Sequence, residues 1–496
     1  MHPPSPPEPS TPSPADTVLR HGRAAIVLPI GVVRAAVGSF HPRHLPPLLR
    51  ATYARELVSW LFLPFMLGAI EGGTIAIVVK KAFTGEVDPW VLNLAVTILT
   101  AAPNFANLTS FLWSAAARGR PKVPFISGLQ IATSILVALV AAMPMNAWGL
   151  WGTVTLICLA RTTWTGVITL RTAVWRNNYP KANRATIAGK MATVQSIVLA
   201  AAGWIVGFAM DANPIAFRFA FPMLAAVGLF GNQVYRKVRL RGQKRLARAE
   251  LQGRAGPSFT LHPISMGRAL VRSGREIWTT LDEDRHYRQF MWWMSVFGFG
   301  NLMLFAPLAI YLNDRFEVSY LEGILINTII PLAVMPLAIP MWARLLDRGH
   351  VIEFRAVHGW TFVAASACMW LGALVDSLLL FEVAAVILGL GFAGGVLAWN
   401  LGHHDFAPAH KDSQYMAVHV TLNGLRGLLA PIAAYLLYEW LAPRGHAAEV
   451  FLVCTVVNVI GVLGFVRMRK ELRRERARRA AEAGEPATVP AVGESN

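Results

Sequence analysis

Twelve apolar runs are the strongest constraint on how this chain folds. Each is long enough to cross about 30 Å of hydrocarbon as a helix, which takes roughly 20 residues. The runs lack the period-2 alternation of membrane β-barrel strands and are about twice as long as such strands. They fall into two sets of six: 56–79, 90–115, 123–143, 148–172, 185–210 and 214–235, then 288–312, 320–343, 354–376, 379–402, 413–438 and 446–467. The sequence therefore predicts an all-α integral membrane protein with twelve transmembrane helices.

The net charge of +18 is concentrated beside the predicted spans. Its excess lies in residues 236–250 and 467–481, each directly after an apolar run. Attraction to anionic lipids explains both segments, so we expect no nucleic-acid partner. Apolar residues make up 54% of the chain and charged residues only 15%, too few for an ordinary soluble protein of this length.

Basic residues in the short connections predict the orientation. Three connections share an excess of Lys and Arg: 116–122, 171–184 and 344–355. We therefore expect these connections and both termini on the cytoplasmic side of a multi-pass inner or plasma membrane protein. Lys80 and Lys81, in a connection that would lie outside, are the one contrary signal.

The predicted spans divide the chain into five parts. We expect a Pro-rich, partly interfacial cytoplasmic tail, two six-helix bundles, a basic cytoplasmic linker and a basic cytoplasmic C-terminal tail. The first tail contains the short apolar stretch AAIVLPIGVVRAAVG, which we interpret as interfacial, and no signal peptide is expected. In chain order, the five parts cover residues 1–50, 51–236, 237–285, 286–468 and 469–496.

The two sets of six runs resemble each other. An ungapped overlay of the segment from Arg55 on the segment from Arg288 matches several residues, and a second overlay matches Gly166 with Gly395. Both offsets are near 230 residues, which indicates an internal duplication. Two pseudo-symmetric six-helix bundles joined by a long loop are typical of transporters whose site lies at mid-membrane between the halves.

The most specific motif is WARLLDRGH, between the eighth and ninth runs. It resembles the G-x-L-x-D-R-x-G loop of the major facilitator superfamily, with Ala343 in place of the first glycine. The resemblance implies that Asp347 and Arg348 carry gating charges, the carboxylate facing a helix N-terminus and basic partners in one conformation. In the first half, WSAAARGRPKV keeps Arg118 and Arg120 but has no aspartate, so these residues are either half of a gate or simple markers of the cytoplasmic side.

The eleventh run carries three polar side chains on one face. At 100° per residue, His419, Asn423 and Arg426 are separated by about 40° and 60°. An arginine at the centre of a span costs roughly 2.5 to 3.5 kcal/mol, so it is expected to face a wet cavity or an acidic partner. Helix–helix hydrogen bonding is the alternative for Arg426 and His419. The chief acidic residue inside a run is Glu71.

The family resemblance implies that the first, fourth and eleventh spans border a central path, which would place Glu71, Arg161 and the polar face of the eleventh run around one cavity. Gly72 and Gly73 beside Glu71 permit close approach of another helix or of a solute. A carboxyl group whose surroundings change as a cavity opens can bind and release a proton. Glu71 is therefore either a proton carrier or a permanent structural partner of an arginine.

These features predict a secondary active transporter, working by alternating access and coupled to protons. The sequence has no G-x-x-x-x-G-K-[ST] motif for ATP. We expect a monomer that binds a small-molecule solute, protons and anionic lipids, with no cofactor and no enzymatic activity. Cavity arginines favour an anionic or polar solute, whereas the many Trp and Met residues are compatible with a bulky amphipathic one.

Two alternatives stay open. One is a transporter-like membrane sensor that moves no solute. The other is a membrane metalloenzyme, because HHDFAPAH offers ligand types at close spacing in His403, His404, Asp405 and His410. That spacing fits no standard helical H-x-x-x-H pair, so we expect no metal site.

Overall fold

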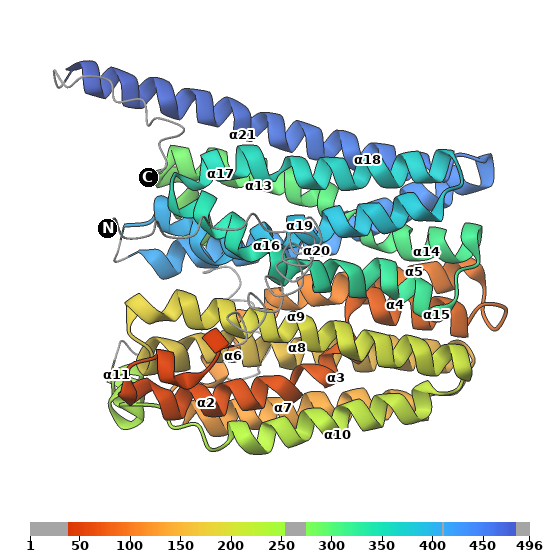
Figure 1. Ribbon diagram of the computed structural model, residues 1–496, viewed down its shortest axis with the longest axis horizontal. Helices are drawn as coiled ribbons and strands as arrows, with labels where there is room; N and C mark the ends of the chain where they lie inside the picture. The colour runs from red at the N-terminus through yellow and green to blue at the C-terminus, as the bar shows by residue number, and fades with distance from the viewer. Residues whose placement is uncertain (1–37, 253–273, 409–410, 483–496) are drawn as a thin grey trace, which may run out of the picture. The chain divides into compact units, whose positions relative to one another are not determined.

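The computed structural model describes residues 38–252, 274–408 and 411–482. Within these ranges all regular elements are helices, which confirms the predicted all-α class (Figure 1). Contacts divide the chain into two compact units, residues 1–55 and 56–496. The first unit contains η1 (Pro42–His44). In the same unit, Tyr53 donates a hydrogen bond of 3.0 Å to the carbonyl of Phe40. The apolar stretch predicted to be interfacial lies, but for its last residue, outside the described residues.

Helices of the first half follow the first set of apolar runs, and several begin with a side-chain cap or a proline. Asp88 caps the second span through the backbone N–H groups of Trp90 and Val91, and Asn146 caps the fourth through that of Gly149. The elements are α2 (Pro47–Phe62), α3 (Pro64–Ala69), α4 (Gly72–Ala82), α5 (Pro89–Phe105), η2 (Ala106–Thr109), α6 (Ser110–Ala116), α7 (Lys122–Leu139), η3 (Val140–Ala142), α8 (Ala147–Asn178), α9 (Lys181–Ala212) and α10 (Phe217–Tyr235).

The second half repeats this plan. Asp284 caps its first helix, and Ser319 and Glu322 form a capping box at the start of its second span. The elements are α13 (Arg285–Leu302), α14 (Phe305–Phe316), α15 (Tyr320–Ile324), the π-helical turn η4 (Leu325–Ile329), α16 (Ile330–Asp347), α17 (Val351–His358), α18 (Trp360–Leu374), α19 (Leu378–Leu401), η5 (Gly402–Asp405), α20 (Asp412–Leu441), η6 (Ala442–Arg444) and α21 (Glu449–Glu482).

Eleven helical segments in the described residues are long and apolar enough to cross a membrane. They coincide with eleven of the twelve predicted runs. The remaining run corresponds to α10, a helix of 19 residues in the place expected for the sixth span. The twelve helices form the two pseudo-symmetric six-helix bundles predicted from the sequence.

The first span of each half is broken at equivalent positions. In the first half α3 ends at Ala69 and α4 begins at Gly72; in the second half α13 ends at Leu302 and α14 begins at Phe305. Adding 233 to either residue of the first break gives the matching residue of the second, the same offset that relates Arg55 to Arg288. The duplication thus extends from sequence to local geometry.

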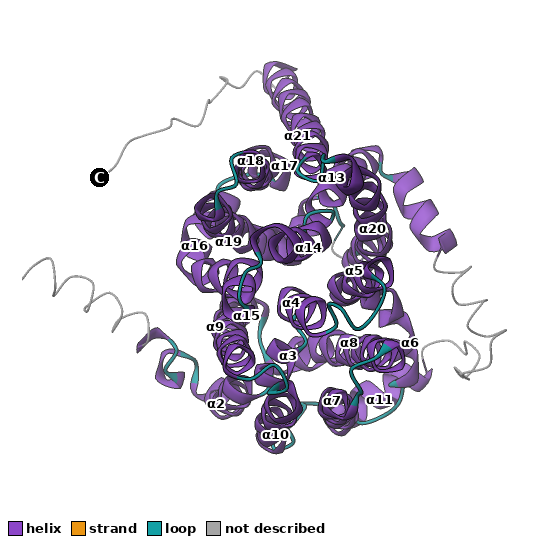
Figure 2. Ribbon diagram, turned by 90° about the vertical axis from the view of Figure 1, so that its right-hand side faces the viewer, coloured by secondary structure: helices purple, strands orange, loops and turns teal. Residues whose placement is uncertain are grey.

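The two bundles meet along a few helix pairs. Between the halves, α5 packs against α20, α4 against α14 and α15, and α9 against α15, η4 and α16. Figure 2, which looks along the spans, shows α4 beside α14 and α5 beside α20. We call the end of the spans that carries the 117–121 and 348–350 connections the basic end, and the other the opposite end.

The last helix extends beyond the predicted span. We predicted that the twelfth span ends near residue 467, but α21 continues through the basic segment to Glu482. Pairs at i, i+4 support this extension, as between Arg467 and Glu471 at 3.0 Å. Arg473 also lies 3.4 Å from Glu353 of α17, which ties the extension to the second half.

The linker between the halves begins with a short helix, α11 (Gln243–Gln252), at the basic end. Its Glu250 accepts hydrogen bonds from the backbone N–H of Gly119, at 2.8 Å, and from Lys122 Nζ, at 2.7 Å. The connection after the second span has no aspartate of its own, and the linker supplies a carboxylate to it.

Candidate functional site

Glu71 lies at the break in the first span. Its backbone is extended, with φ −61° and ψ 138°, and it occupies the N-cap position of α4. Interruption of the helix frees the carbonyl of Ile70, and Gly73 allows close packing of α4 on the second half. A Cβ at Gly73 would lie 2.9 Å from Asn327 Cβ and would collide with Thr328 of η4.

Arg161 of α8 joins the two sides of this break. Its Nη2 lies 3.0 Å from Glu71 Oε2, and the same guanidinium donates to the carbonyl of Ile70. The arginine is 7% exposed and the Glu71 side chain 29% exposed. The sequence prediction that Glu71 and Arg161 lie together therefore agrees with the structure, and the guanidinium serves both as counter-ion and as a cap for the freed carbonyl.

Arg426 of α20 does not have the acidic partner that the sequence suggested. Its Nη2 and Nε donate to Asn423 Oδ1 at 2.9 and 3.3 Å, and its Nη1 donates to the carbonyl of Met294 at 3.0 Å. Gly298 leaves room for it, since a Cβ there would lie 2.7 Å from Arg426 Nε. Glu71 is paired with Arg161 instead, and among the described residues no carboxylate pairs with Arg426.

The polar face of α20 is buried, but only part of it borders the cavity. Asn423 lines it and lies 3.5 Å from Asn104 Oδ1 across the interface between the halves. His419 is not among the lining residues: its ring packs against Trp399 at a centroid distance of 4.3 Å, and the indole takes its place on the wall. The prediction that His419 faces the solute path is corrected on this point.

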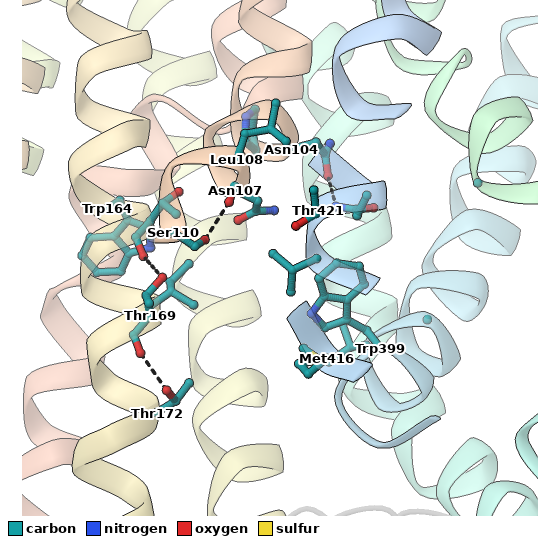
Figure 3. A pocket seen from close by; sticks show the side chains of 18 of the residues that line it. Asn104, Asn107, Leu108, Ser110, Trp164, Thr169, Thr172, Trp399, Met416 and Thr421 are labelled. Atoms are coloured by element: carbon teal, nitrogen blue, oxygen red, sulfur yellow. Dashed lines mark hydrogen bonds between the residues drawn. The ribbon is translucent and has the colours of Figure 1, made fainter. Parts of the chain in front are cut away.

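One cavity of about 1710 Å³ lies between the halves. Glu71, Arg161, Asn423 and Arg426 all line it, as the sequence predicted. Figure 3 shows the wall: Asn107, Ser110, Thr169 and Thr172 of the first half lie across from Trp399, Met416 and Thr421 of the second. Each half thus contributes polar side chains and at least one indole, Trp164 in the first half and Trp399 in the second.

The cavity reaches from the helix breaks to the basic end. At that end it is lined by exposed residues of both halves and of the linker, including Arg118, Thr172 and Glu276. No residue from the connections at the opposite end belongs to its lining. The cavity is therefore open towards one end of the spans.

The opposite end is closed by polar contacts between the halves. Lys80 of α4 lies 2.8 Å from Asp314 of α14 and 2.7 Å from Asn93 Oδ1. Asn93 in turn donates to Glu439 of α20 at 2.7 Å. Lys80 is 3% exposed, so one of the two lysines that opposed the predicted orientation is buried by this contact.

Two further contacts extend this closure. Asp211 of α9 accepts from the backbone N–H groups of Tyr320 and Leu321, at 2.7 and 3.0 Å, and so caps α15 of the other half. Lys81 donates to the carbonyl of Val318 at 2.6 Å.

Near these contacts, but within the second half, Arg315 donates to Asp376 and lowers the pKa of that carboxyl. The sequence predicts no transport role for Asp211 and Glu439, because both lie near expected span ends; their partners in the other half lie far along the chain.

The predicted gating residues lie at the basic end. Asp347 and Arg348 are exposed, and in the described part of the chain neither forms an ion pair. Arg118 and Arg120 are exposed as well, and the guanidinium of Arg120 lies 5.8 Å from the ring centroid of Phe125. The geometry thus places all four residues at the open end and leaves Asp347 unengaged.

Sequence reasoning missed Arg355. It lies on α17, is 2% exposed and lines the cavity. Its Nη1 lies 3.4 Å from His358 Nδ1, and His358 Nε2 lies 2.7 Å from the carbonyl of Gly391. From the sequence, it is one of the basic residues that flank a span predicted to start at residue 354. The helix begins at Val351, which places Arg355 one turn inside it.

A second missed cluster lies on the first-half wall. The guanidinium of Arg171 lies between two indoles, 4.1 Å from the ring centroid of Trp60 and 4.6 Å from that of Trp175. Trp175 Nε1 donates to the buried carboxylate of Glu56 at 2.7 Å. The two ring faces stabilise the charge of Arg171 within its own half, but among the described residues it has no ion pair and its Nη1 is buried without a hydrogen-bond partner.

The His-rich segment after α19 has a structural explanation. Asp405 accepts from the backbone N–H of Val351 at 2.6 Å, which caps α17, and lies 3.9 Å from His350, whose pKa is lowered by burial. The rings of His403 and His404 lie against each other at 4.2 Å. Within the described ranges no three His, Cys, Asp or Glu side chains are placed to hold a metal ion. His410 lies outside those ranges.

Comparisons with known proteins point in one direction. Residues 58–431 match the family described as Major Facilitator Superfamily. Three solved structures each cover 84% of this chain: a mutant of the nucleoside transporter NupG, a D-xylose–proton symporter, and a POT family transporter in complex with 5-aminolevulinic acid. Their TM-scores are 0.60, 0.61 and 0.60, their identities 11%, 12% and 14%, and the matched share of their own chains 99%, 96% and 96%. No curated protein matches the sequence.

Proposed function

The chain belongs to the major facilitator superfamily of membrane transporters, and from this premise we propose that it moves a small solute by alternating access, with protons as the coupling ion. It works as a secondary active transporter, drawing on an ion gradient. We place it in a cell inner or plasma membrane with the basic end and both termini in the cytoplasm, as the distribution of Lys and Arg favours.

The asymmetry of the cavity carries this proposal. One chamber between the halves opens at the basic end, while Lys80, Asn93 and Asp211 bridge the halves at the other. A site that is accessible from one side only, between two repeats, is what alternating access requires. With the basic end in the cytoplasm, this is the inward-open state.

The outward-open state follows from reversing this asymmetry. The bridges of the opposite end separate as the halves rock, and the basic end closes. Asp347 and Arg348, unengaged in the inward-open state, are then available to contact the other half. Two sets of contacts that exclude each other make the protein bistable, so solute and protons shift the balance between two states.

Glu71 is the proposed proton carrier. It borders the cavity, stands at the break of the first span and is ion-paired with Arg161. In the proposed cycle this ion-paired form alternates with a protonated one. Protonation removes the attraction to the guanidinium, whereas Arg161 keeps the carbonyl of Ile70 as a partner. The helix break would therefore persist while the charge of the site changes.

Purified protein in vesicles tests this proposal. An imposed pH gradient should drive accumulation of the solute in wild-type vesicles, and an internal pH dye should report the accompanying protons. We expect Glu71→Gln to abolish gradient-driven accumulation while retaining solute exchange. Glu86→Gln, an exposed glutamate at the opposite end, is the matched control and should behave as wild type.

Two results would reject parts of the proposal. Full gradient-driven transport by Glu71→Gln would remove this residue from coupling but leave the carrier in place. Absence of flux for every solute that binds the wild-type protein would favour a membrane sensor instead.

A further inference from the structure

Two buried arginines of the second half have no carboxylate partner in the described ranges. Arg355 on α17 is 2% exposed and Arg426 on α20 is 5% exposed, and both line the cavity. Among the described residues neither forms an ion pair. Arg161, across the cavity, differs because it is paired with Glu71.

Neutral groups satisfy these guanidinium groups only in part. A guanidinium has five N–H donors. Arg426 directs donors to Asn423 and to the carbonyl of Met294. Within the described part of the chain, Arg355 Nη1 has His358 as its one hydrogen-bonding contact, at 3.4 Å, and Arg355 Nε is buried without a hydrogen-bond partner. Donors in a low-dielectric interior that lack acceptors are costly, so the site is incomplete as it stands.

The rest of the wall does not offset these charges. Of the residues that the structure describes, five arginines and two glutamates line the cavity. Glu71 is committed to Arg161, and Glu276 is exposed at the mouth. Of the other arginines, Arg118 is exposed at the mouth. Arg171 is held between two indoles near Glu56 in the first half. Arg355 and Arg426 of the second half, which among the described residues have neither a carboxylate partner nor an aromatic ring face over the guanidinium, are therefore the charges of the wall that are compensated least.

We propose that Arg355 and Arg426 form an oxyanion subsite and that the transported solute is an organic anion bearing a carboxylate or phosphate group. This inference rests on the proposed transport function and names its substrate class. Guanidinium groups match the planar acceptors of carboxylate and phosphate, and their hydrogen bonds to anions are about twice as strong as those between neutral groups. Trp399 and Phe392 of the second half also line the cavity and supply apolar contact for the organic part of the solute.

Binding to the full-length protein in detergent tests the proposal with matched pairs of probes. Glutarate and glutaramide, benzoate and benzamide, and glucose 6-phosphate and glucose are similar in shape and differ in charge. We expect at least one anion to bind about tenfold or more tightly than its neutral partner. Arg355→Gln and Arg426→Gln should each weaken that binding by about 10- to 100-fold.

Further variants separate binding from folding. Arg355→Lys and Arg426→Lys keep the charge but lose the planar fork, so they should bind the anion with intermediate affinity. Arg218→Gln, an exposed residue at the start of α10, removes one positive charge outside the cavity and should bind as wild type. If the two arginines only join helices, the Gln variants will lose thermal stability and keep their anion affinity, which would overturn the proposal.

The same panel in vesicles distinguishes this inference from the proposed function. Glu71-dependent, gradient-driven flux of a neutral compound, with no anion preferred over its partner, would reject the oxyanion subsite and leave the proton-coupled carrier intact. Anion binding that needs both arginines but is never followed by flux would keep the subsite and reject the carrier. A panel in which no anion binds better than its neutral partner overturns the inference.

Discussion

Arg161 Nη2 lies 3.0 Å from Glu71 Oε2, across the point where the first span is interrupted. This pair links a long helix of the first half to the break in another, and it stands on the wall of the cavity between the halves. Charge, local backbone geometry and access to water therefore meet at one place in the fold.

Removing either member of this pair should destabilise the protein. Arg161→Gln leaves Glu71 without its counter-ion and weakens the cap on the Ile70 carbonyl. Because Glu71 is partly exposed, we expect a loss of about 1 to 2 kcal/mol in the free energy of unfolding in detergent. The double variant with Glu71→Gln should lose less than the sum of the single variants. Additive losses would show that the two side chains do not interact.

The closure of the opposite end should depend on Lys80. Lys80→Met leaves Asp314 and Asn93 without their common partner. A double-mutant cycle with Asp314→Asn should give a coupling energy of about 1 kcal/mol, modest because the Asp314 side chain is 38% exposed. The exposed pair Arg315 and Asp376 lies at the same end but within one half, so its removal should leave the closure unchanged.

Gly73→Ala should open the opposite end. The added methyl group would collide with Thr328 of η4, pushing the halves apart where they meet. A cysteine introduced at Thr97, which is fully buried on α5, then serves as a reporter of access. We expect its labelling by an impermeant maleimide to accelerate about tenfold. Gly128→Ala is the matched control, because a Cβ there meets nothing within 4 Å. Equal labelling in the two variants would contradict this contact.

Glu250→Gln should loosen the linker helix from the first half. The change weakens the acceptor for Gly119 N–H and removes the counter-charge of Lys122. Hydrogen exchange at residues 117–122 and 243–252 should speed up by about tenfold, the effect of losing about 1.4 kcal/mol. Glu475→Gln, on the exposed part of α21, should leave these segments unchanged.

The sequence predicted the spans well because each must satisfy its backbone inside hydrocarbon, which makes long apolar helices the only solution for such runs. The family resemblance in the sequence also indicated that Glu71 and Arg161 lie around one cavity. In the same way, the ungapped overlay from Arg55 on Arg288 anticipated that the two halves would share local geometry, and the helix breaks carry the same offset.

Tertiary partners explain what sequence reasoning missed. Lys80 is an exception to the rule that Lys and Arg mark cytoplasmic connections. The structure explains the exception, because Lys80 is paired with Asp314, which lies 234 residues later in the chain. The sequence predicts Arg355 as a charge that flanks a span starting at residue 354. The helix starts three residues earlier, at Val351, and this shift places Arg355 on the cavity wall instead of in solvent. For Arg426 the sequence predicted a wet cavity or an acidic partner. It lines the cavity, and its hydrogen bonds go to Asn423 of the preceding turn and to the Met294 carbonyl of α13 rather than to a carboxylate.

Alternating access around the cavity is the central claim, and two distances measured by spin labels test it most directly. In a background lacking Cys158, Cys368 and Cys454, one pair of labels at positions 86 and 446 spans the opposite end, and another at 177 and 344 spans the basic end. Lowering the pH, or replacing Glu71 by Gln, should lengthen the first distance and shorten the second in the same population of molecules. Two distances that stay fixed under all conditions, including saturating solute, would contradict the account.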